Sequence, residues 1–328
     1  SYPNQLKDSS FEVCTSTPSS AWVRSSTSGV VFNSSSPHSG SKYATVQISA
    51  TPTASTAYKA SLYQTVTLTG GKTYSLSAYI RTEPNGGSWS YGGAYLYFAN
   101  GSGTILRSSD VITFDTGEIE NGWMCIFVSY TPTASGSYRV GICLDNAKGS
   151  VDVDDMQLER GEAPNAYNLL QNSSAEFTDA FGGWTTASGT GSSLKSVTDT
   201  IDGAKVIEVV GHTGLDKYAY QDVVLNESNP STYLLSGWAK ATTLPFAEDP
   251  ETGFTATDRF FGLKATIYYA DNTTEDTYIP VNCYCEDWQY VCGVVVPKKT
   301  GTISKIRVYT DLNHNTGPAY FDNITLTK

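Results

Sequence analysis

The chain has 328 residues, of which only 16% are charged, and its formal net charge is −11. An excess of acidic side chains disfavours nucleic acid and anionic membrane surfaces as partners, because both attract basic faces. The sequence contains no run of about 20 apolar residues, so we expect no membrane-spanning helix.

Alternating polar and apolar residues predict short strands along the whole chain. The alternation is clear at 72–81, 138–142 and 305–309, and it is typical of strands with one buried face. Turn clusters rich in Gly and Asn separate such segments, for example at 69–71 and 100–103. Many short strands without a helical segment of about 12 residues predict an all-β fold built from sandwiches.

The sequence contains two copies of one pattern. The segment at 4–12 returns at 168–176, and the segment at 153–158 returns at 321–326. A period of about 165 residues is that of a whole domain and not of a solenoid unit. We therefore predict two domains, residues 1–161 and 162–328, joined by a short linker that contains Gly and Pro.

Three recurring motifs resemble those of the galactose-binding-like jelly roll found in many carbohydrate-binding modules. They are an opening Asn-x-Leu-x-x-Ser-Ser-x-Glu followed by a Trp, a Gly-x-Lys strand entry at 40–42 and 203–205, and a closing Val-Asp-Asp or Phe-Asp-Asn pattern with a hydrophobic residue and a Leu after it, at 153–158 and 321–326. The second copy keeps the first two motifs and varies the closing one. The resemblance covers essentially the whole chain and extends to tandem modules of large bacterial cell-surface proteins. It implies two tandem jelly-roll β-sandwich domains, located outside the cell or on its surface.

The resemblance also implies one structural Ca²⁺ in each domain, where the first and last strands meet. Its ligands would be the side chains of Glu12 and of Asp154 or Asp155, with carbonyls from Ser39 to Lys42, and in the second copy Glu176, Asp322 and carbonyls from Asp202 to Lys205. Carboxylates and carbonyls are the oxygen ligands that Ca²⁺ takes. The alternative is that these carboxylates simply hydrogen-bond backbone groups at strand ends. In either case the site stabilises the fold and does not catalyse.

Aromatic side chains, 12% of the chain, are the candidate ligand contacts, because flat rings suit the C–H faces of sugars. The predicted contacts are Trp89, Tyr91, Tyr95 and Tyr97 in the first domain and Tyr218, Tyr220, Trp238 and Tyr268 in the second. Trp89 and Tyr91 have no counterpart in the second copy, which favours binding over core packing. For the recurring Trp22, Trp123, Trp184 and Trp288, core packing is favoured. The second copy carries an insertion at 245–255 in place of the Trp89 loop, so we expect the copies to bind differently.

The six Cys, three in each half, occupy no equivalent positions in the two copies. Free thiols, one local disulfide and a metal site are the alternatives. Paired C-x₂-C spacing is absent from the sequence, which disfavours zinc.

The sequence thus predicts non-catalytic binding of a poly- or oligosaccharide by a monomeric tandem module of a larger extracellular protein. A structural spacer or adhesion stalk without a glycan ligand is the alternative. The sequence contains neither His-Glu-x-x-His nor Gly-x-Ser-x-Gly, so we expect no enzyme. A glycosidase with two facing carboxylates is the third hypothesis, and it needs a cleft between them.

Overall fold

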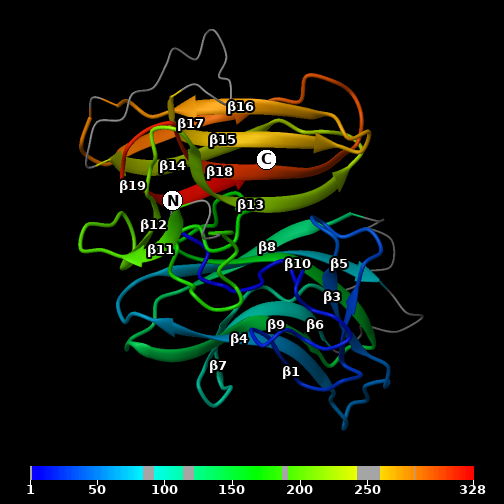
Figure 1. Ribbon diagram of the computed structural model, residues 1–328. Helices are drawn as coiled ribbons and strands as arrows, with labels where there is room; N and C mark the ends of the chain where they lie inside the picture. Colours follow the sequence, from blue (N-terminus) through cyan, green and yellow to red (C-terminus); the bar gives the residue numbers. More distant parts are fainter. Residues whose placement is uncertain (1, 84–91, 114–121, 187–190, 242–258, 284) are drawn as a thin grey trace. The chain divides into compact units, whose positions relative to one another are not determined.

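The computed structural model describes residues 2–83, 92–113, 122–186, 191–241, 259–283 and 285–328. Within these residues the chain forms antiparallel strands and no helix (Figure 1). It divides into two compact units, Pro3–Asn165 (unit 1) and Ala166–Lys328 (unit 2). The sequence pattern put the boundary a few residues earlier, between 161 and 162. No helix of the described residues is long and apolar enough to cross a membrane.

Unit 1 is a sandwich of two five-stranded sheets. One sheet has the order β1 (Val23–Arg24), β4 (Lys59–Leu68), β9 (Gly136–Asp145), β6 (Gly93–Asn100) and β7 (Ile105–Ser108). The other has the order β2 (Val30–Asn33), β3 (Tyr43–Ile48), β10 (Gly149–Arg160), β5 (Tyr74–Glu83) and β8 (Met124–Tyr130).

Unit 2 repeats this strand order with a five-stranded and a four-stranded sheet. The first sheet runs β11 (Ser192–Ser196), β12 (Lys205–Val209), β19 (Ala319–Thr327), β14 (Tyr233–Ala241) and β17 (Gln289–Val295). The second runs β13 (Asp216–Glu227), β18 (Ile303–Asn313), β15 (Phe260–Tyr269) and β16 (Thr274–Pro280). The predicted all-β class with two tandem β-sandwiches is therefore confirmed.

Alternation along each strand sends every second side chain into the core. In unit 1, Leu62 and Ile142 of one sheet join Leu76 and Val153 of the other in one buried cluster. Unit 2 has its own core, which contains Val308, Leu235 and Phe321 among others. The apolar faces of the two sheets in each unit thus form the core that the sequence pattern predicts.

The recurring tryptophans fall into two groups. Trp22 and Trp184 are 3% and 7% exposed and belong to the cores. Their indole N–H groups donate to the carbonyls of Asp8 (2.8 Å) and Asn172 (3.0 Å). Trp123 and Trp288 are only half-buried and lie outside both cores, so the core prediction is wrong for them.

An asparagine clip fastens the first segment of each unit to its last strand. The Asn4 side chain donates to the carbonyl of Met156 (3.0 Å) and accepts from the N–H of Leu158 (3.0 Å). Asn168 makes the same bonds to Ile324 (3.1 Å) and Leu326 (3.0 Å). A single amide that offers both a donor and an acceptor satisfies two backbone groups at once. This explains why the opening and closing motifs recur together.

Candidate functional site

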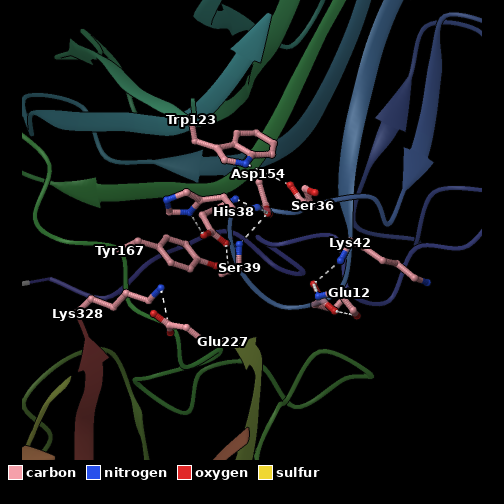
Figure 2. A network of polar contacts seen from close by, with 12 residues as sticks. Glu12, Ser36, His38, Ser39, Lys42, Trp123, Asp154, Tyr167, Glu227 and Lys328 are labelled. Carbon is pink, nitrogen blue, oxygen red and sulfur yellow. Dashed lines mark hydrogen bonds and ion pairs between the residues drawn. The ribbon is translucent and has the colours of Figure 1, made fainter. Parts of the chain in front are cut away.

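The predicted calcium ligands of unit 1 hold a loop through its backbone N–H groups (Figure 2). Glu12 Oε1 accepts from the N–H groups of Ser41 (2.9 Å) and Lys42 (3.0 Å). Asp154 Oδ2 accepts from those of His38 (2.9 Å) and Ser39 (3.2 Å). We call these two side chains, with the loop they hold, the carboxylate clamp.

Unit 2 has the same carboxylate clamp. Glu176 Oε1 accepts from the N–H groups of Ala204 (2.9 Å) and Lys205 (2.8 Å). Asp322 Oδ2 accepts from those of Ile201 (2.9 Å) and Asp202 (3.1 Å). Four bonds of the same kind in both units account for the acidic residues that the two copies share.

A glycine lets the clamped loop approach the glutamate in each unit. Gly40 and Gly203 have φ angles of +63° and +65°, a region that side chains with a Cβ rarely adopt. A Cβ at either position would lie 2.3 Å from the carboxyl group of Glu12 or Glu176. The Gly-x-Lys motif therefore reflects this close approach.

The groups around the clamp carboxylates are mostly donors, whereas Ca²⁺ requires six to eight oxygen ligands. Ser39 and Lys42 direct N–H groups at the carboxylates. The Asp155 carboxylate instead contacts His38 Nδ1 (2.6 Å) and accepts from Ser39 Oγ (2.6 Å). Among the described residues, no group of three or more His, Cys, Asp or Glu side chains could hold a metal ion. The residues fit an amide clamp better than a calcium cage, and calcium stays a prediction.

Burial raises the pKa of three clamp carboxyls. It raises the pKa of Glu12, and it raises that of Asp154 well above its usual range with a further contribution from the neighbouring Asp155 charge. The pKa of Asp322 rises to about 7 because of its burial. The N–H donors oppose these shifts by stabilising the ionised forms.

The predicted ligand residues of unit 1 do not form an open aromatic platform in the described residues. Trp89 and Tyr91 lie outside the part of the chain that the structure describes. Tyr95 and Tyr97 on β6 are 7% and 6% exposed. They pack with Ala99, Cys143 and Tyr63 in a small cluster separate from the core. Alternation places these rings on the outer side of the sheet, but it does not reveal that they are covered.

Three of the four predicted ligand residues of unit 2 share one sheet face. Tyr218 and Tyr220 of β13 and Tyr268 of β15 alternate with core residues, and so do Tyr309 of β18 and Tyr278 of β16. All five are half-buried, and we call them the tyrosine face. The ring centroid of Tyr309 lies 5.2 Å from that of Tyr218 and 6.2 Å from that of Tyr220. Sequence reasoning missed Tyr309 and Tyr278, although the alternation at 305–309 contained the signal.

Charged side chains lie among these rings. The Arg307 guanidinium lies 4.1 Å from the ring centre of Tyr220, and Lys305 Nζ lies 4.6 Å from that of Tyr268. Lys264 Nζ lies 5.0 Å from the ring centre of Tyr309. Such contacts are cation–π interactions that orient the rings. The tyrosine face thus combines flat apolar surfaces with fixed hydrogen-bonding groups.

Trp238, the fourth predicted residue, is not part of this face. It lies on β14 in the other sheet of unit 2, paired with Tyr290 of β17. The two ring centroids are 5.5 Å apart. The sequence identified Trp238 as a surface aromatic residue but could not assign it to a sheet.

All six Cys, which lie within the described residues, are free thiols. Burial raises the pKa of Cys14 to about 12 and that of Cys143 to about 11. A thiol with such a pKa is a poor nucleophile at neutral pH.

The architecture of the two units defines a tandem β-sandwich protein. No protein-family model matches the chain. The chain is similar in sequence to the tRNA nuclease WapA of Bacillus subtilis (strain 168), with 28% identity over 346 residues. The tRNA3(Ser)-specific nuclease WapA of Bacillus spizizenii has the same identity. Each match takes in 99% of this chain and 14% of the relative.

Among solved structures, the chain is similar to carbohydrate-binding modules. The CBM22-1–CBM22-2 tandem of Paenibacillus barcinonensis Xyn10C matches with a TM-score of 0.37 and 16% identity, over 100% of this chain and 98% of that one. TmCBM61 in complex with β-1,4-galactotriose has a TM-score of 0.35 and 21% identity, over 48% of this chain and 99% of that one. These similarities concern the fold.

The prediction that the protein is not an enzyme is corrected by the relatives in sequence. Proteins that match nearly the whole chain are named as nucleases, and nucleases are enzymes. The chain spans 14% of the length of these relatives. The absence of His-Glu-x-x-His and Gly-x-Ser-x-Gly does not exclude an enzyme, because these are motifs of metalloproteases and α/β-hydrolases only.

Proposed function

We propose that the chain binds carbohydrate through the tyrosine face of unit 2. The observation that carries this proposal is the gathering of five half-buried tyrosines with Arg307, Lys264 and Asp222 on one sheet face. Ligand sites combine apolar and aromatic surfaces with a few placed polar groups. A sugar ring matches both features. Its C–H faces can pack on the tyrosine rings, and its hydroxyls can hydrogen-bond the charged side chains.

The geometry of the face supports recognition of an extended ligand. Tyr220, Tyr309 and Lys264 lie in register across three neighbouring strands, and Tyr278 continues the row on β16. Neighbouring strands are about 4.8 Å apart, so a row of four positions is long enough for more than one sugar ring.

A glycan array followed by affinity electrophoresis in polysaccharide gels tests the proposal. We expect Tyr309→Ala and Tyr220→Ala to lower affinity about tenfold, because each removes one stacking ring. Tyr290→Ala is the matched control, because Tyr290 is an exposed tyrosine of the other sheet. The proposal fails if no glycan binds the wild type, or if all three variants bind alike.

A second candidate function comes from the relatives in sequence. Since they match 99% of the chain, we propose that the two units belong to a longer protein with tRNA-nuclease activity. Incubation of the purified chain with total tRNA, with and without Mg²⁺, tests whether the two units cleave tRNA themselves. The appearance of shorter tRNA fragments in denaturing gels would assign the cleavage to this chain.

We also propose that the protein is located outside the cell or on its surface, because a polysaccharide ligand would be found there. Fractionation of the producing cells, with immunodetection of the chain, tests this part. Recovery only in the soluble cell interior would contradict it.

A further inference from the structure

The two units can be aligned strand by strand through a glutamine on β4 and on β13. Gln64 bonds both the N–H and the carbonyl of Lys7 (2.9 Å each), and Gln221 bonds those of Gln171 (2.7 and 2.9 Å). Lys7 and Gln171 hold the same place in the opening motif of the two copies. The residues that follow the two glutamines, at positions 65 and 222, are therefore counterparts.

An arginine lies opposite this position in both units. Thr65 is in register with Arg139 of β9, and Asp222 is in register with Arg307 of β18. The two arginines are thus counterparts as well. The residue that each one faces carries a hydroxyl in unit 1 and a carboxylate in unit 2.

In unit 2 the arginine binds this carboxylate with both prongs. Arg307 Nε and Nη2 donate to the two carboxylate oxygens of Asp222 (2.7 and 2.9 Å), while the guanidinium lies over the Tyr220 ring. This is the planar geometry in which a guanidinium recognises a carboxylate. The Asp222 side chain therefore marks where a carboxylate fits on this sheet face.

Unit 1 keeps the arginine and the ring but lacks the carboxylate. The Arg139 guanidinium lies 4.7 Å from the ring centre of Tyr63, the counterpart of Tyr220. On another side it meets the β6–β7 turn, where a Cβ at Gly103 would lie 2.9 Å from Arg139 Nη1. Among the residues that the structure describes, no carboxylate pairs with Arg139.

The unpaired guanidinium of Arg139 is held in place and can be reached from outside. Arg139 is half-buried, and Thr65 beside it is exposed, so a ligand can approach the place that Asp222 occupies in unit 2. A partly buried charge without a partner has lost hydration without compensation. Since Tyr63 and the turn at Gly103 already restrict the side chain, binding an anion costs it little further freedom.

We propose that Arg139 of unit 1 binds the carboxylate of an acidic sugar, with the Thr65 hydroxyl next to it, so that unit 1 recognises a polysaccharide that contains uronic acid. The ligand carboxylate takes the place that the Asp222 carboxylate has in unit 2. This inference rests on the proposed carbohydrate binding for the class of the ligand. It adds a second site, in the other unit, with a charge preference of its own.

The test compares acidic polysaccharides with neutral forms of the same backbone. The probes are polygalacturonate, alginate and hyaluronan, each beside its carboxyl-reduced form, and calorimetry measures their binding to the whole chain. We expect at least one acidic form to bind about tenfold more tightly than its reduced form. The net charge of −11 repels anionic polymers, so such a preference requires a local contact. No preference for the acidic form of any of the three probes overturns the inference.

Two variants show whether Arg139 makes this contact. Arg139→Gln should abolish the preference for the acidic form. Thr65→Asp should abolish it too, because the new carboxylate would pair with Arg139 as Asp222 pairs with Arg307, whereas Thr65→Asn should keep it. Lys72→Gln, at an exposed position of unit 1, removes the same charge elsewhere and is the matched control. A preference that survives in Arg139→Gln or in Thr65→Asp overturns the inference.

Two further measurements separate this inference from the proposed function and from a peptide ligand. Binding of a neutral glycan through the tyrosine face should fall in Tyr309→Ala and stay unchanged in Arg139→Gln. A wild type that binds no neutral glycan refutes the proposed function, whereas the acid preference reports on Arg139. Poly-glutamate offers carboxylates without a sugar. If it binds as tightly as the best acidic polysaccharide and depends on Arg139, the ligand is an acidic peptide and the assignment to carbohydrate is wrong.

Discussion

Asp222 and Arg307 face each other across β13 and β18 and form two hydrogen bonds, of 2.7 and 2.9 Å. Burial raises the pKa of Asp222, but the bonds from Arg307 and Lys305 outweigh it and lower the pKa overall. The same guanidinium lies over the Tyr220 ring. One ion pair therefore fixes a ring of the tyrosine face.

Arg307→Lys should weaken this arrangement, because an ammonium cannot make the two-pronged bond or stack flat on the ring. We expect stability to fall by about 1 kcal/mol and glycan affinity to fall with it. Urea unfolding and affinity electrophoresis measure the two effects. Lys195→Arg changes an exposed lysine that pairs with Glu208 in the other sheet and should change neither. Unchanged glycan affinity of Arg307→Lys would show that ring orientation is not needed.

Gly40→Ala should release the loop of the carboxylate clamp in unit 1. It combines a positive φ with a Cβ placed 2.3 Å from Glu12 Oε1, so we expect a loss of about 2–3 kcal/mol. Gly71→Ala is the matched control, because Gly71 has a φ of +77° and no atom within 4 Å of its Cβ position. It should cost only about 1 kcal/mol. Equal losses in urea unfolding would mean that the contact with Glu12 is unimportant.

Glu12→Ala tests whether the clamp acts without a metal. Its carboxylate bonds three donors of Ser41 and Lys42, so we expect a loss of about 2 kcal/mol in EDTA. The loss should be the same in excess CaCl₂, measured by thermal melting. A loss that appears only with calcium would instead establish the predicted cation, through its linkage to folding.

The stability of unit 2 should depend on the proton that Asp322 binds. Because the folded pKa is about 7 and that of an unfolded Asp is about 3.9, the folded unit keeps a proton that the unfolded chain has released. This contribution is complete below pH ~4 and is lost as the pH rises through ~7. We expect urea midpoints to fall over this window in the wild type and to fall less in Asp322→Asn. Equal slopes would refute the assignment.

Asn168→Ala removes the clip of unit 2. It leaves the buried carbonyl of Ile324 and N–H of Leu326 without their partner, and we expect a loss of about 2–4 kcal/mol. Thr213→Ala, at an exposed position, should be neutral within about 0.5 kcal/mol. A loss no larger than that of Thr213→Ala in urea unfolding would show that water satisfies both groups.

The fold could be predicted because equivalent side chains make the same contacts with the backbone in each unit. Asn4, Glu12 and Trp22 recur as Asn168, Glu176 and Trp184 since each satisfies or covers specific backbone groups. Such residues cannot drift without loss of stability, so they remain visible in the sequence. The strand alternation then separates inner from outer side chains.

The candidate site could be predicted only in part. Alternation places Tyr95, Tyr97, Tyr218 and Tyr268 on outer faces, but burial of Tyr95 and Tyr97 depends on packing from distant segments. The assignment of Trp238 to the other sheet depends on strand order, which local pattern does not encode. The tyrosine face depends on a register between β13 and β18 that joins residues far apart in the chain.

Each asparagine clip closes entirely within its own unit, from Asn4 to Met156 and Leu158 or from Asn168 to Ile324 and Leu326. A gene segment that encodes one unit therefore encodes both the asparagine of the clip and the strand to which it binds. Copying, excising or transplanting such a segment should deliver a working domain, with no partner needed to secure its ends.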